Sequence, residues 1–327
     1  MVWREPTGVK ESLLNTDMQE KKNRRLAIIL VGLLLVTGGV YWFGQNDHQY
    51  AVDKNLFNNF DLKTIDQITL ESINGKVDLK FNGSRWKVNE EFEAEASMID
   101  VLFATLQRAE PKQPIANSLQ DSTNAALTRD GVKVNLFTTG SKVYGFYAGG
   151  NAQKTKAIFK AEDDGQSHQV IIPGYRVYVS GIFELPEKDW RNRLVFAFNW
   201  RNFQQLDALF PEKDQDNFTV VMDKQFFGVK GLPQTDTTKL NDFLDQVSLL
   251  TVDEYLSASA DSDSLFTGNP IMKINVTDIA SRSYSLELYP FDKMRNQFPG
   301  LINGKDRSVF AVEKIRELFR PKQFFKP

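Results

Sequence analysis

The stretch VDLKFNGSRWKVNEEFEAEASMIDVLFATLQR, residues 77–108, decides the fold class of this chain. Its first half holds two alternating apolar and polar segments, 77–81 and 85–88, joined by Asn82-Gly83. Asn-Gly between alternating segments is a strong signal for a β-hairpin. In the second half apolar residues recur at i, i+3, i+4 and i+7, which predicts an amphipathic helix over 96–108 with one side facing a core. A hairpin followed by such a helix predicts an α+β fold.

The same pattern returns 141 residues later, in FTVVMDKQFFGVKGLPQTDTTKLNDFLDQVSL, residues 218–249. Without any insertion or deletion, apolar residues meet apolar residues at Val77/Phe218, Leu79/Val220, Phe81/Met222, Trp86/Phe227, Val88/Val229, Ile99/Leu240, Leu102/Phe243, Phe103/Leu244 and Leu106/Val247. With a shift of 140, VKVNL (132–136) meets MKINV (272–276), including identical Lys and Asn. We therefore predict an internal duplication, with a chance match between two generic strand-helix modules as the alternative.

The sequence predicts two similar modules, each a mostly antiparallel sheet with a helix. The first covers 58–190 and the second covers 191–327, with the boundary expected near 181–193. Further strands are expected at 65–73, 132–138, 142–147, 157–161 and 170–172, and a last helix is expected at 312–319. The segment 198–209 is expected to open the second module. Two segments without a clear period, 111–127 and 257–270, are predicted to be long loops.

An uncharged segment near the N-terminus, LAIILVGLLLVTGGVYWF (26–43), is long enough to cross most of a bilayer core. Basic residues precede it, namely Lys21, Lys22, Arg24 and Arg25. The positive-inside rule then places residues 1–25 in the cytoplasm as a short tail, with 44–57 as a connector on the other side. The apolar segment is longer than a signal-peptide core and no small-x-small cleavage site follows it, so we expect an uncleaved anchor.

Composition excludes several classes of protein. The 327 residues include no cysteine, which excludes disulfides, thiolate metal sites, iron-sulfur clusters and a cysteine nucleophile. Lys and Arg number 40 against 42 Asp and Glu, so the formal charge is −2 and the usual electrostatic case for nucleic-acid binding is missing. With 41% apolar residues and 25 Phe, the chain has ample material for packed cores.

Signals for a catalytic or metal site are weak. The two histidines, His48 in the connector and His168 in a predicted hairpin tip, are expected to be solvated, without the positioned partner that catalysis needs. The acidic segments 162–164 and 261–263 lack the spacing of a calcium loop. We predict no metal and no cofactor.

One local cluster stands out, Asp189-Trp-Arg-Asn-Arg193, with two arginines that flank an amide and follow an indole. Arg191 and Arg193, with Arg176 upstream, could bind a carboxylate or phosphate bidentately. The favoured alternative is structural: Trp190 fills the interface between the two modules, and the arginines pair there with Asp or Glu.

The segments QVIIPGYRVYVS (169–180) and DWRNRLVF (189–196) resemble the bacterial family catalogued as domain of unknown function 4340. Its members have similar Ile-Pro-Gly and Trp-Arg signatures, and the likeness extends to the N-terminal anchor, Ile68-Thr-Leu70 and Arg85-Trp-Lys-Val88. It covers most of residues 20–200. The resemblance implies a single-pass inner-membrane protein that faces the periplasm, in some cases encoded beside components of ABC-type transport systems, and it carries over no catalytic residue.

These observations predict a non-enzymatic, membrane-anchored periplasmic module that binds a protein or envelope partner, as an accessory subunit of an envelope or ABC-type transport complex. Two other functions stay open. One is a periplasmic hydrolase with a site between the modules that uses carboxylates or His168. The other is a small-ligand sensor that relays movement through the span to the N-terminal tail.

Overall fold

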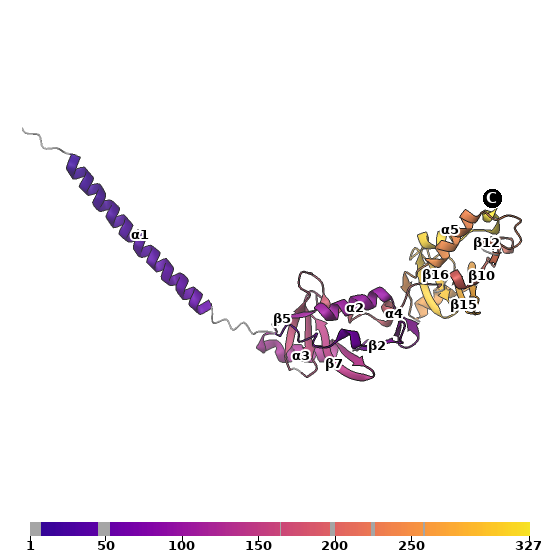
Figure 1. The fold of residues 1–327 in the computed structure, drawn as a ribbon, viewed down its shortest axis with the longest axis horizontal. Coiled ribbons are helices and arrows are strands. Elements are labelled where there is room, and N and C mark those ends of the chain that lie inside the picture. The colour runs from indigo at the N-terminus through magenta and orange to yellow at the C-terminus, as the bar shows by residue number, and fades with distance from the viewer. Residues whose placement is uncertain (1–7, 45–52, 164, 197–199, 224–225, 258) are drawn as a thin grey trace, which may run out of the picture. The chain divides into compact units, whose positions relative to one another are not determined.

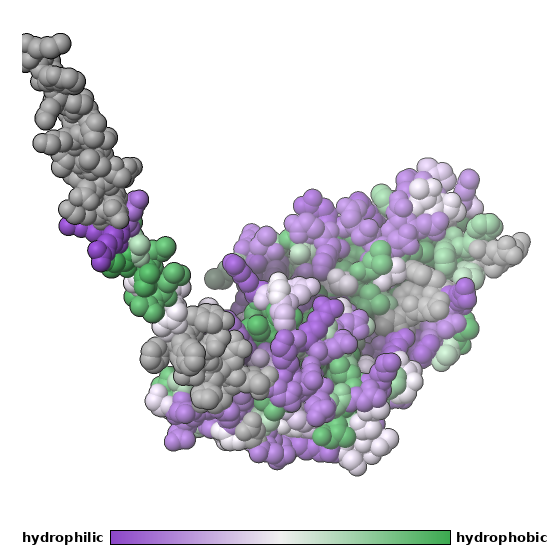
Figure 2. All heavy atoms as spheres, turned by 60° about the vertical axis from the view of Figure 1, so that its left-hand side comes forward, coloured by the Kyte–Doolittle hydropathy of each residue, from purple (hydrophilic) through white to green (hydrophobic). Residues whose placement is uncertain are grey.

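The apolar segment forms part of one helix, α1 (Gly8–Gly44), in a computed structural model that describes residues 8–44, 53–163, 165–196, 200–223, 226–257 and 259–327. Within α1, the 19 residues Lys22–Val40 have a mean hydropathy of 1.6 and none of their side chains is buried. Figure 2 shows the described part of this helix as a hydrophilic segment followed by a hydrophobic one. Its length and composition are consistent with a membrane anchor or a signal sequence. His48 and most of the 44–57 connector lie outside the described residues.

The first sheet has nine strands, in the order β4-β3-β2-β1-β6-β7-β8-β9-β5, and all neighbours are antiparallel. The strands are β1 (Gln67–Ser72), β2 (Gly75–Phe81), β3 (Trp86–Val88), β4 (Phe92–Glu93), β5 (Glu110–Pro114), β6 (Val132–Thr138), β7 (Ser141–Gly150), β8 (Ala157–Ala161) and β9 (Ser167–Ile171). The accompanying helices are η1 (Leu62–Thr64), α2 (Ala96–Arg108), α3 (Asn117–Asp130), η2 (Val179–Ile182) and α4 (Glu187–Trp190).

The second sheet has eight strands, in the order β12-β11-β10-β14-β15-β16-β17-β13, again all antiparallel. The strands are β10 (Phe203–Leu209), β11 (Phe218–Asp223), β12 (Phe226–Val229), β13 (Glu254–Tyr255), β14 (Met272–Asp278), β15 (Ser283–Leu288), β16 (Gln297–Ile302) and β17 (Asp306–Ala311). The accompanying helices are η3 (Trp200–Asn202), η4 (Asp214–Asp216), α5 (Thr237–Ser248), α6 (Ala260–Asp263), η5 (Ser264–Phe266), α7 (Val312–Arg316) and η6 (Lys322–Phe325).

The two sheets repeat one strand order. In each module, three strands precede the helix α2 or α5, and one short strand, β5 or β13, follows it. Four more strands, β6–β9 or β14–β17, come next, and the short strand pairs with the last of these four. The first sheet adds β4 at one edge. The α+β class and the two similar antiparallel modules that the sequence predicts are therefore present (Figure 1).

Cross-strand pairing follows the same register in both modules. Ile68 on β1 pairs with Leu79 and Leu136, and Leu206 on β10 pairs with Val220 and Val276. All six side chains are fully buried. Leu79 and Val220 are 141 residues apart, and Leu136 and Val276 are 140 apart, as in the sequence comparison. Side chains that alternate between the two sides of a strand thus place equivalent residues in equivalent core positions.

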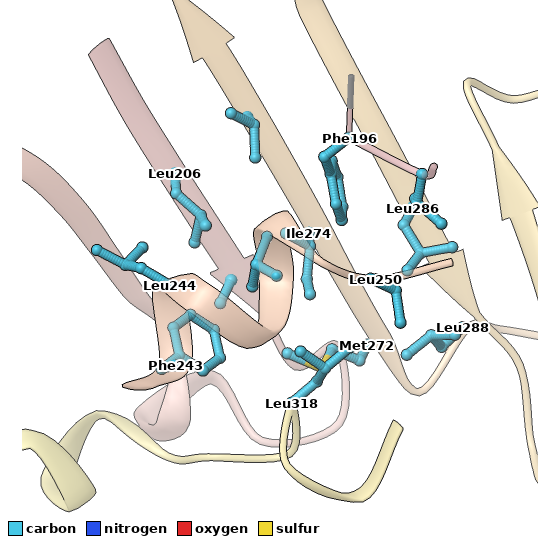
Figure 3. Close-up of a cluster of buried hydrophobic side chains, with 14 of the residues drawn as sticks. Phe196, Leu206, Phe243, Leu244, Leu250, Met272, Ile274, Leu286, Leu288 and Leu318 are labelled. Atoms are coloured by element: carbon cyan, nitrogen blue, oxygen red, sulfur yellow. The ribbon is translucent and has the colours of Figure 1, made fainter. Parts of the chain in front are cut away.

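The two long helices bury their apolar stripes on the sheets. In α2 the buried residues include Ile99, Leu102 and Leu106, and in α5 they are Leu240, Phe243, Leu244 and Val247. Figure 3 shows α5 lying on its sheet, with Phe243 and Leu244 beside Leu206 and Ile274. Each module therefore has its own core between one helix and one sheet.

Some sequence-based predictions are wrong. The segment 111–127 is not a long loop, because it contains most of β5 and the first part of α3. Two prolines in β5 hide its strand character, but β5 is an edge strand, where proline is tolerated. Helix α3 has little apolar periodicity, since Leu127 is its only buried residue. The last helix, α7, ends at Arg316 and is shorter than predicted.

The matched core positions give a stability prediction. Ile68→Ala and Leu206→Ala each remove a fully buried side chain from the centre of one sheet, and we expect each to lower the free energy of unfolding by about 2–5 kcal/mol. Ile73→Ala, at a residue 78% exposed just after β1, should change it by less than about 0.5 kcal/mol. Urea denaturation of the full chain followed by circular dichroism measures both. Equal effects of Ile68→Ala and Ile73→Ala would contradict this register.

Candidate functional site

The chain passes from the first module to the second through residues 190–195, which we call the junction. On the first side, the Glu95 N–H donates to the Trp190 carbonyl (2.8 Å) and the Asn192 N–H donates to the Glu93 carbonyl (2.8 Å). On the second side, the Val252 N–H donates to the Arg193 carbonyl (2.8 Å). Between Asn192 and Arg193 the hydrogen bonds of the backbone change from the first module to the second. The junction is therefore held by both modules and is not a free linker.

The Arg191 guanidinium is the centre of the junction. Its Cζ lies 3.5 Å from the ring centroid of Phe92 on β4 and 4.0 Å from that of Tyr255 on β13. Two rings cannot occupy one side of a guanidinium at these distances, so the group is stacked between an aromatic ring of each module. The Arg191 side chain is only 12% exposed and its Nη2 lies 2.9 Å from Oδ1 of Asp306 on β17.

Other polar contacts surround this stack. The Tyr255 hydroxyl donates to the Asn192 carbonyl (2.8 Å). Burial raises the pKa of Tyr255 above its ordinary value, and the nearby Arg191 charge opposes only part of this effect. Lys188 pairs with Glu254 and Lys305 pairs with Glu91, both at 2.6 Å. The side chains of these two ion pairs are 32–56% exposed, and ion pairs exposed to solvent contribute little to the free energy of folding. The stacked, nearly buried Arg191 is therefore the main polar contact between the modules.

The structure separates the residues that the sequence singles out. Trp190 is fully buried in the core of the first module, where its Nε1 donates to the Leu185 carbonyl at 3.4 Å, so it does not fill the interface. Arg191 does pair with carboxylates, Asp306 and more distantly Glu187 (4.0 Å). Arg193 is exposed and contributes its backbone. Arg176 lies in an exposed segment after β9.

His168 also differs from expectation. It lies on β9 and is only 5% exposed, with its ring 6.2 Å from that of Phe57, so the prediction of a solvated hairpin tip is wrong. The strand predicted at 170–172 begins three residues earlier, at Ser167, because the polar residues around His168 hide its strand character. Within the described residues, no group of three or more His, Asp or Glu side chains is placed to hold a metal ion.

A groove follows one side of α2, and we call it the α2 groove. It consists of two adjoining hollows, of about 900 and about 1130 Å³, that share Phe81, Trp86, Ile99 and Asp100. The first hollow extends toward Phe60, Leu62 and Phe103, and the second toward the junction and the second module at Asn192, Leu194 and Tyr284. Volumes of this size suit a ligand or a segment of another chain.

Three aromatic rings, those of Phe81, Trp86 and Phe103, line the α2 groove. The ring centroids of Phe81 and Trp86 are 5.8 Å apart, and those of Trp86 and Phe103 are 5.4 Å apart with an edge-on arrangement. Phe81 is 40% exposed. Exposed aromatic side chains beside a hollow are typical of binding surfaces. The sequence does not indicate this groove, because Phe81, Trp86 and Phe103 match the apolar core pattern of a hairpin and a helix.

The charged residues at the junction end of the α2 groove are paired. Arg85 Nη1 lies 2.6 Å from Oε2 of Glu93, and Arg282 Nε lies 2.6 Å from Oδ2 of Asp278. Burial by itself raises the pKa of Asp278. Hydrogen bonds from the Arg282 backbone N–H (2.9 Å), the Arg282 side chain and the Ala280 N–H (3.0 Å) outweigh it, so this pKa lies below its ordinary value. Asp278 thus fixes the turn that brings Arg282 to the groove.

Comparison with known proteins gives no relative for this chain: no family model matches it, and neither the curated proteins nor the solved structures contain a significant match.

The Arg191 stack predicts the effect of a charge-conserving change. Arg191→Lys keeps a positive charge near Asp306 but loses the planar group between Phe92 and Tyr255, so we expect stability to fall by about 1–3 kcal/mol. Arg193→Lys is the control, because that side chain is exposed.

Arg191→Lys should also change the distance between the modules. Because the chain has no cysteine, Asp121→Cys and Gln246→Cys carry unique spin labels, one in each module. Pulsed electron paramagnetic resonance should give a narrow distance distribution with Arg191 and a broader one with Arg191→Lys. Identical distributions would show that the stack does not hold the modules together.

Asp278 predicts a pH dependence. Because its pKa is lower in the folded than in the unfolded chain, its charge contributes stability above pH of about 4, and this contribution is lost as the pH falls through the folded pKa. Asp278→Asn should therefore be less stable than the native chain at pH 7, and the difference should shrink toward pH 3. Urea denaturation of both proteins across this range tests it, and a difference that is constant with pH would refute the role of the charge.

Proposed function

We propose that this protein is a non-enzymatic, membrane-anchored binding module, an accessory subunit of an envelope or ABC-type transport complex. In this proposal α1 crosses the inner membrane of a bacterium once, the N-terminal residues lie in the cytoplasm, and the two modules lie in the periplasm. The family resemblance of residues 169–196 supports this location. The proposal includes membership of that family.

The observation that carries the proposal is the exposure of the apolar part of α1. Its Leu, Ile and Val side chains are 55–72% exposed, as shown for Leu26, Ile28, Ile29, Leu30, Val31, Leu33, Leu34, Leu35, Val36 and Val40. An uninterrupted apolar helix in water is unfavourable, whereas each such residue gains roughly 0.3–0.6 kcal/mol at the centre of a bilayer. Four basic residues at positions 21–25 precede it and favour a cytoplasmic N-terminus.

The α2 groove supports a binding role. It has an aromatic lining, it is open to solvent, and its charged residues at the junction end are occupied in ion pairs with one another. A chain that holds such a surface close to a membrane by a single helix suits an accessory subunit, because the anchor raises the local concentration of the surface near membrane partners.

The proposal is tested by purification from native membranes. The full chain, extracted in a mild detergent, should carry a multi-span membrane protein in roughly constant ratio, and a variant without residues 1–44 should lose most of it. Arg193→Lys in the full chain serves as a matched control for expression and handling. Recovery of the full chain alone, under conditions that preserve other membrane complexes, would refute the accessory role.

A further inference from the structure

Asp100 is the one acidic side chain common to both hollows of the α2 groove. It is exposed, and among the described residues it forms no ion pair and no side-chain hydrogen bond. The other acid at the junction end, Glu93, is paired with Arg85, and the Asp61 carboxylate accepts the Lys63 N–H at 3.0 Å. An unpaired carboxylate thus lies midway along a groove with an aromatic lining.

The shape of the groove restricts its occupant. Its α2 wall is formed by Ala96, Ile99, Asp100, Phe103, Ala104 and Gln107, which recur at three and four residues and so lie in one row along the helix. The twelve residues from Ala96 to Gln107 extend about 18 Å along the helix. An occupant that fills this length is elongated, and an acyl chain would leave much of its surface in water because the groove is open. An amphipathic helix of about three turns matches both the length and the row of α2 side chains.

We propose that the α2 groove binds an amphipathic helix of a partner protein, with apolar residues at i, i+3, i+4 and i+7 and a central Lys or Arg that pairs with Asp100. The apolar residues pack on Phe81, Trp86 and Phe103, and the basic side chain lies between the carboxylate and the aromatic rings, where both attract a cation. This inference rests on the proposed function, because it names the chemistry of the partner that an accessory subunit would bind.

Site-specific photo-crosslinking in native membranes tests it. The full chain carries p-benzoylphenylalanine in place of Ala104, an exposed residue that lines the groove. Mass spectrometry then identifies the crosslinked segment. We expect an amphipathic helical segment with a central basic residue, an adduct yield about threefold lower with Asp100→Asn and at least about tenfold lower with Asp100→Lys.

Asp121→Lys is the matched control, because it makes the same charge change on the exposed side of α3. Its adduct yield should equal that of the native chain, and thermal unfolding should be alike for all variants. An adduct to a lipid, to a second copy of this chain or to a segment without a basic residue would overturn the inference. An adduct yield that is the same in the Asp100 variants and the native chain, or the absence of any adduct, would also overturn it. If the membrane partner still co-purifies in those cases, the proposed function stands and only this inference fails.

Discussion

The stacking of Arg191 between Phe92 and Tyr255 is the contact on which the arrangement of the two modules depends. Each module buries its own core, and the two clusters share no residue. What relates them is the junction, where the backbone exchanges hydrogen-bond partners within two residues and one nearly buried guanidinium contacts both sides. Its ion pair with Asp306 compensates the loss of hydration, although the Nε atom has no hydrogen-bond partner among the described atoms. The junction end of the α2 groove is formed from both modules, so its shape depends on this contact.

Local pattern predicts much of the fold because each module repeats short-range signals. Asn82-Gly83 joins β2 and β3 as expected, α2 and α5 begin 141 residues apart, and β6 and β14 occupy matching seven-residue segments 140 apart. Features that depend on tertiary position were not predictable. Proline-containing β5 is a strand because it lies at an edge, and His168 is buried because β9 lies between β8 and β5. For the site, the sequence identifies Arg191 as unusual, but its aromatic partners are distant in the chain.

The two modules share a scaffold but differ at the position where the groove lies. The ladders of β1 and β10 match from Gln67 and Gln205 onward, and a register shift between Phe203 and Gln205 ends the match before them. In the second module Phe203 packs against Phe227 with ring centroids 5.3 Å apart. In the first module Ile65 lines the hollow, and Trp86, the equivalent of Phe227, contacts Phe81 and Phe103 instead. Trp86 and Phe227, which match in the 141-residue comparison, thus pack against different aromatic neighbours without any change in strand order.

The extra strand β4 explains a second difference. In the first sheet β3 pairs with β4, which supplies Phe92 to the Arg191 stack and the Glu93 carbonyl to the Asn192 N–H. In the described part of the second module, the equivalent strand β12 has no such neighbour, and the Thr235 side chain accepts the Val229 N–H at 3.1 Å. A side chain thus satisfies an edge where another strand could have paired. The edge that carries β4 contacts the junction and the second module. At the matching edge of the second module, the Thr235 side chain accepts the backbone N–H of β12 instead. The two similar modules therefore differ at the edge through which the first contacts the second.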